Sequence, residues 1–72
     1  MKTSDIIILA RKYIGFGVMD SSAKLCLSDA TTLVEIGQLD YAKKRALQSL
    51  AYSIGRLHPD YIRTTGQLQL TQ

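Results

Sequence analysis

The chain has 72 residues, one cysteine, one histidine and a formal net charge of +3. A chain of this length forms one domain, near the lower size limit at which a hydrophobic core alone can hold a fold. One cysteine excludes an internal disulfide, and one Cys with one His cannot complete a tetrahedral zinc site. This cysteine usage fits a reducing compartment, so we expect a cytoplasmic protein without metal or cofactor.

The first predicted element is a helix that opens at Thr3 or Ser4 and runs to about Ile14. Threonine and serine are good N-cap residues, and Asp5 in the first turn favours the positive end of a helix. The β-branched residues 6–8 also suit a strand, which stays open as an alternative. Apolar side chains lie nearly all round this segment, so more than one neighbour must cover it.

The apolar run at residues 6–10 needs to be tested as a targeting or membrane segment. Arg11 and Lys12 cut it off, and no small-residue cleavage site follows directly. The run is also far shorter than the bilayer requires. We therefore expect no membrane association.

A glycine-rich break at residues 15–17 separates the first helix from a second one, which begins among residues 20–22 and ends at about Ile36. Gly37 follows where a left-handed residue commonly ends a helix. The apolar stripe of this helix has offsets of 0, 3, 4, 7, 10 and 11, the spacing of one buried helix face. Its members are Ala23, Cys26, Leu27, Ala30, Leu33 and Val34.

A third helix is predicted from Tyr41 to Leu57, with Asp40 as its cap and Pro59 preventing much continuation. Its small residues Ala42, Ala46, Ser49 and Ser53 form a row that lets a neighbouring helix approach closely. Because the connection at residues 37–40 is short, the second and third helices should form an antiparallel hairpin. The sequence therefore predicts an all-α, three-helix domain over residues 1–66.

At residues 67–72 glutamine alternates with leucine before the final Thr-Gln, a pattern that matches a strand with no sheet to join. We expect a flexible C-terminal tail, either disordered or docked on a partner.

No catalytic site is predicted. His58 has only Asp60 as a nearby carboxylate, and a histidine before proline is more typical of a helix end. Most acidic residues fall at helix starts, whereas Asp29 lies mid-helix as a solvated or ion-paired residue. Cys26 lies on the apolar stripe, so it is either a buried core residue or a reactive thiol.

The chain has more large apolar residues than one small core can bury, and the surplus residues are the predicted partner-binding positions. Leu25 and Ile36 lie off the main stripe of their helix, and an exposed apolar line of this kind marks an interaction surface. Tyrosine suits the margin of an interface. The predicted set is Ile7, Ile8, Leu25, Ile36 and Tyr61.

Residues 43–45 form the only basic cluster, and they span an arc of about 200° on a helix. With Arg56 they give an alternative, nucleic-acid-binding interpretation through Lys43, Lys44, Arg45 and Arg56.

A helix that ends in Gly37, followed by Tyr41 and Ala42 early in the next helix, resembles the middle of a tetratricopeptide-type repeat. Leu33, Asp40 and Leu50 fit the same pattern, and residues 57–60 resemble the exit of such a repeat. The resemblance covers about half the chain. It implies a helical hairpin that presents a surface to protein.

Together these features predict a non-enzymatic adaptor or inhibitor that binds another protein and forms a homodimer. The alternative is a small basic protein that binds nucleic acid.

Overall fold

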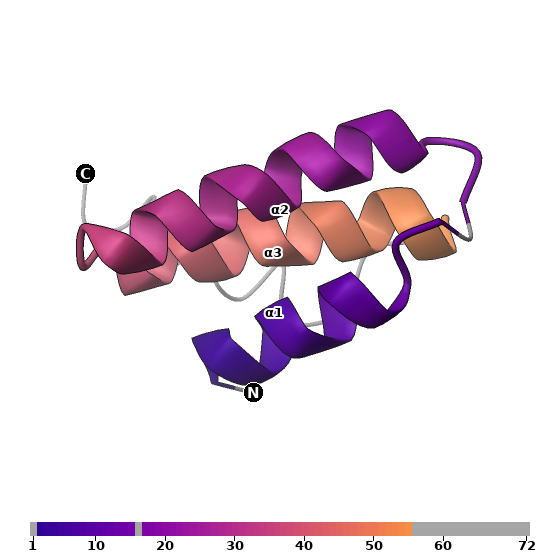
Figure 1. Cartoon of the computed structure of the whole chain (residues 1–72). Helices are drawn as coiled ribbons and strands as arrows, with labels where there is room; N and C mark the ends of the chain where they lie inside the picture. Colours follow the sequence, from indigo (N-terminus) through magenta and orange to yellow (C-terminus); the bar gives the residue numbers. More distant parts are fainter. Residues whose placement is uncertain (1, 16, 56–72) are drawn as a thin grey trace.

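The computed structural model describes residues 2–15 and 17–55, which form three helices and no strand (Figure 1). They are α1 (Thr3–Lys12), α2 (Asp20–Glu35) and α3 (Leu39–Ile54). The all-α prediction is confirmed, and the β-branched residues 6–8 are helical. The predicted tail at 67–72 lies outside the described residues.

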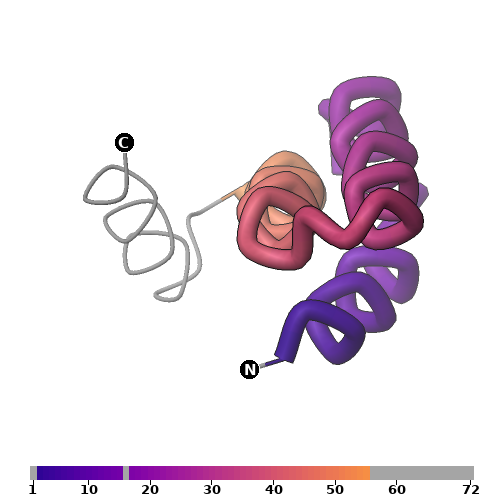
Figure 2. Tube along the Cα trace, turned by 90° about the vertical axis from the view of Figure 1, so that its left-hand side faces the viewer, coloured from indigo at the N-terminus to yellow at the C-terminus, as the bar shows by residue number. Residues whose placement is uncertain are grey.

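Helices α2 and α3 lie antiparallel and pack most closely, and α1 packs mainly against α3. Viewed nearly end-on, the three helices stand at the corners of a triangle (Figure 2). The predicted hairpin is therefore present, and α1 lies along one side of it.

Small side chains fill the seam between α2 and α3. Ala23 and Ala30 of α2 and Ala42 and Ala46 of α3 are fully buried, as the predicted row of small residues requires. Ser49 is also fully buried, and its hydroxyl donates a hydrogen bond of 2.7 Å to the Ala23 carbonyl oxygen. This bond joins the two helices and satisfies the only buried polar side chain among the described residues.

The larger core side chains lie where α1 meets the hairpin. One cluster combines Ile6 and Ile7 of α1 with Ala30 of α2 and with Ala46 and Leu47 of α3. The buried face of α1 is therefore Ile6, Ile7 and Ala10. Tyr13, which follows the last residue of α1, is 38% exposed.

The α2–α3 connection is a Schellman motif built on Gly37, as its place in the sequence predicted. Gly37 has a φ of +83°, its N–H donates to the Val34 carbonyl, and the Gln38 N–H donates to the Leu33 carbonyl. This arrangement satisfies carbonyls at the end of α2 and turns the chain directly into α3.

The other helix ends differ from the sequence predictions. None of the three described helices has a side-chain N-cap hydrogen bond, so Thr3 and Asp40 do not act as the predicted caps. Helix α1 ends at Lys12, before Ile14. Helix α3 ends at Ile54, because Gly55 takes a left-handed conformation with a φ of +75°, and the predicted end at Leu57 is wrong.

The break between α1 and α2 allows a close backbone contact at Gly17. A Cβ atom at this position would lie 2.8 Å from the Ser53 carbonyl oxygen and 2.9 Å from that of Tyr52. Only glycine leaves room for the loop to pass the end of α3 at this distance.

Candidate functional site

An open groove of about 890 Å³ lies between α1 and the end of the hairpin where α2 meets α3. Its α1 wall consists of Lys2, Thr3, Ser4, Ile7, Ile8 and Arg11. The opposite wall consists of Thr31, Val34 and Glu35 from α2 with Leu39 and Asp40 from the start of α3.

Two features hold the walls of the groove in place. The Thr3 hydroxyl donates a hydrogen bond of 3.2 Å to the Leu39 carbonyl oxygen, which ties the start of α1 to the start of α3. The Gly37 turn fixes how α3 leaves α2. Since α1 packs mainly against α3, the groove opens on the side of α1 that faces the last turns of α2.

Both walls of the groove carry exposed apolar side chains. Ile8 is 63% exposed on the α1 wall, and Leu39 is 53% exposed on the opposite wall next to the partly exposed Val34. Aliphatic surface on both walls is typical of a site that accepts an apolar side chain.

The charges of the groove are separated by wall. Lys2 and Arg11 stand on the α1 wall, and Glu35 and Asp40 stand on the opposite wall. In the part of the chain that the structure describes, none of these four side chains forms an ion pair or a side-chain hydrogen bond. They are available to an incoming partner.

The predicted partner-binding residues separate into three groups. Ile8, Leu25 and Ile36 are 63%, 69% and 65% exposed, but only Ile8 lines the groove. Ile7 is 7% exposed and belongs to the core cluster, because it faces the hairpin. The prediction that the core does not need Ile7 is therefore wrong. Tyr61 lies outside the described residues.

The sequence missed Val34 and Leu39 as site residues. Val34 fits the core stripe by spacing, and Leu39 falls in the predicted connection between the second and third helices. One feature of the sequence could have indicated Leu39: it is the one large apolar residue in that connection, two residues after the glycine that ends α2.

The basic run of the alternative interpretation lies on α3. Lys43 and Lys44 are half-buried, and Arg45 is exposed with its Nη1 donating a 2.9 Å hydrogen bond to Gln48 Oε1. Arg56 lies outside the described residues. The nucleic-acid hypothesis stays a prediction.

Cys26 is buried against the seam, as its place on the stripe indicates. Burial raises the pKa of its thiol, and the positive charge of Arg45 opposes this shift only in part. A raised pKa lowers the fraction of reactive thiolate, so the core interpretation of Cys26 is favoured over the reactive one. Asp29 is exposed, whereas His58 and Asp60 lie outside the described residues.

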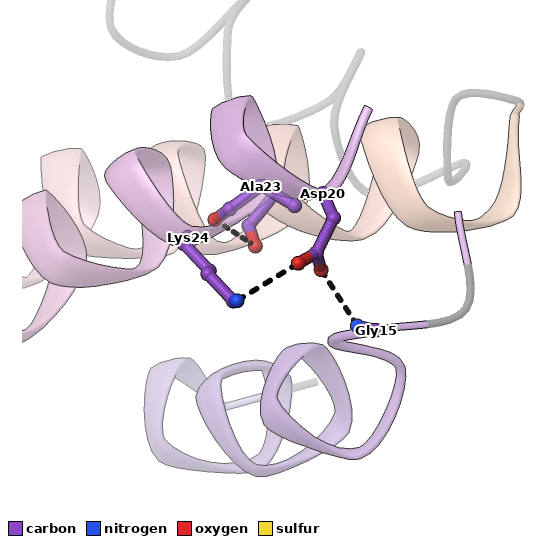
Figure 3. Close-up of polar contacts among 5 residues, drawn as sticks. Gly15, Asp20, Ala23 and Lys24 are labelled. Atoms are coloured by element: carbon purple, nitrogen blue, oxygen red, sulfur yellow. Dashed lines mark hydrogen bonds and ion pairs between the residues drawn. The ribbon is translucent and has the colours of Figure 1, made fainter. Parts of the chain in front are cut away.

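Asp20 fastens the α1–α2 loop to α2 (Figure 3). Its carboxylate accepts a 2.6 Å hydrogen bond from the Gly15 backbone N–H and pairs with Lys24 Nζ at 2.9 Å. The hydrogen bond from Lys24, and then the one from Gly15, hold the pKa of Asp20 below its ordinary value. Beside this fastened loop, Val18 is fully exposed.

Within residues 2–15 and 17–55, no three His, Cys, Asp or Glu side chains gather where they could hold a metal ion. None of the three described helices is both long enough and apolar enough to cross a membrane. Comparison with protein-family models, curated proteins and solved structures gives no match. The tetratricopeptide resemblance therefore stays a prediction.

Proposed function

We propose that this chain is a non-enzymatic helical module that binds another protein through exposed aliphatic side chains. One observation carries the proposal: Ile8, Leu25 and Ile36 each leave more than three-fifths of their surface uncovered. Burying a side chain of this size contributes about 1.5–3 kcal/mol, so a partner that covers them gains substantial free energy.

The groove supports the same function because it offers a concave site next to Ile8. Its aliphatic residues Val34 and Leu39 line the groove together with charged residues of both signs. An apolar centre with a polar rim is the usual anatomy of a protein-binding site.

Affinity retrieval from an extract of the source cells tests the proposal. The immobilised chain should retain a defined protein, or further copies of itself, and Ile8→Glu should lose this binding. Circular dichroism should show the same helix content for both proteins, because Ile8 is exposed and its replacement leaves the core intact. If the variant and the wild type retain the same proteins, the proposal is wrong.

Nucleic-acid binding is the alternative, and the exposed Arg45 is the observation in its favour. Titration against DNA and RNA at two salt concentrations separates the two functions, since phosphate binding weakens steeply as salt rises. Replacing Lys43, Lys44 and Arg45 together by alanine abolishes binding under this alternative and leaves protein binding unchanged under our proposal.

A further inference from the structure

We infer that the groove binds α1 of a second copy of this chain, in a two-fold symmetric dimer. This inference rests on the proposed function and names the partner for the groove.

The separation of charges favours a partner of the same sequence. The α1 wall carries two cations, Lys2 and Arg11, and the opposite wall carries two anions, Glu35 and Asp40. In a two-fold dimer with the α1 wall of one copy against the opposite wall of the other, each cation pair meets one anion pair, and this contact occurs twice. A phosphate backbone or an acidic peptide would be attracted by Lys2 and Arg11 but repelled by Glu35 and Asp40, so it would match only one wall of the groove.

The apolar residues of the groove fit the same arrangement. Ser4, Ile8 and Arg11 are spaced by four and three residues, so they lie on one exposed face of α1. Docking this face into the second copy brings Ile8 to that copy's Val34 and Leu39. Each of these three side chains is then covered, and the symmetry repeats the contact.

The two threonine side chains of the groove need little from a partner. The Thr3 hydroxyl already donates to the Leu39 carbonyl oxygen, and the Thr31 hydroxyl lies within hydrogen-bond distance of the carbonyl oxygens of Leu27 and Ser28. Burying hydroxyls that keep their hydrogen bonds costs little free energy. The four charges are the main groups whose loss of water must be offset, and the dimer pairs them.

Sedimentation equilibrium of the whole chain over a range of concentrations tests the inference. The wild type should show a concentration-dependent rise from the 8.0 kDa mass of one chain towards twice that mass. Ile8→Glu should raise the dissociation constant by about 100-fold, because the symmetry removes two buried isoleucines. Val18→Glu is the matched control, since Val18 is a fully exposed aliphatic residue that lies outside the groove. It should leave the dissociation constant unchanged.

A charge exchange tests the proposed pairing of the walls. Arg11→Glu and Glu35→Arg should each weaken self-association by about tenfold, since each places like charges together in both halves of the interface. An equimolar mixture of the two variants should form the heterodimer with the wild-type constant, as should the double variant with itself.

A wild type that sediments as a single chain at every concentration overturns the inference. So does a dimer that Ile8→Glu and Val18→Glu weaken equally, or one in which mixing the charge variants restores nothing. If the chain is monomeric and Ile8→Glu still loses a different retained protein, the inference is wrong and the proposed function stands.

Discussion

The two sides of the hairpin are built from side chains of different size. Along the α2–α3 seam, Ala23, Ala30, Ala42 and Ala46 are fully buried and Ser49 bonds across the seam. Along the groove between α1 and the hairpin end, Ile8 and Leu39 stay more than half exposed. Small residues let two helices pack closely against each other. Larger side chains on two separate walls that do not contact each other leave a groove.

This difference shows how one short chain combines a stable fold with an open surface. Its stability depends on the seam and on the cluster around Ile6 and Leu47, where little surface is left for a partner. Its candidate binding surface adds exposed residues such as Ile8 and Leu39, which lie outside that cluster. Substitutions on the two sides should therefore have opposite consequences for unfolding and for binding.

The largest expected contrast is between two leucines. Leu47→Ala should lower the free energy of unfolding by about 3 kcal/mol, since Leu47 is fully buried and its truncation leaves a cavity. Leu25→Ala should change it by less than about 0.5 kcal/mol, since Leu25 is 69% exposed. Urea denaturation at low temperature measures both values. Equal losses would show that Leu25 is a core residue.

Gly17→Ala should lower the free energy of unfolding by about 2–3 kcal/mol, because its Cβ would press on the backbone oxygens of Ser53 and Tyr52. Gly37→Ala is the control, because it adds the same methyl group into open space at a φ of +83°. It should cost about 1–2 kcal/mol through backbone strain alone. A Gly17 variant as stable as the wild type would mean that the loop does not pass α3 this closely.

Ser49→Ala should cost about 1 kcal/mol through loss of the buried hydrogen bond across the seam. Ser53→Ala is matched to it, because the Ser53 hydroxyl bonds only within its own helix, to the Ser49 carbonyl. Both changes gain the same helix propensity, so their difference in thermal unfolding reports the bond between helices. No difference would contradict a role for this bond in closing the seam.

The smallest effect concerns Asp20, which holds the exposed loop rather than the core. The pKa of its carboxyl is lowered in the folded chain, so the unfolded chain binds the proton first as the pH falls. The contribution of Asp20 to stability is complete above about pH 4 and is lost as the pH falls through the folded pKa. Asp20→Asn should therefore be less stable than the wild type at pH 7.

The gap between the melting temperatures of the wild type and Asp20→Asn should shrink below about pH 4 and vanish in stronger acid. A gap that is independent of pH would show that the substitution acts through packing or helix propensity instead of through the lost charge of the carboxylate.

The success of the sequence predictions follows the range of the interactions involved. The stripe of α2, the small row of α3 and the turn at Gly37 depend on spacing and backbone preference within a few residues. The turn is confirmed, as is the burial of Ala23, Cys26 and Ala30 in the stripe and of Ala42, Ala46 and Ser49 in the row. Val34 of the predicted stripe is 38% exposed instead, and Ser53 of the row is half-buried. The helix ends were less predictable. The Thr3 hydroxyl bonds to the distant Leu39 carbonyl, and the Asp20 carboxylate bonds to the Gly15 N–H of the preceding loop, so neither side chain caps its own helix.

The sequence by itself determined three helices, the antiparallel hairpin and the small residues that close its seam, because these depend on local periodicity and side-chain size. Only the tertiary structure decided that Ile7 is buried while Ile8 is exposed, and that Val34 and Leu39 face a groove. The physical reason is that α1 is apolar nearly all round. Its own sequence allows several faces to pack, and its contacts with α3 select one.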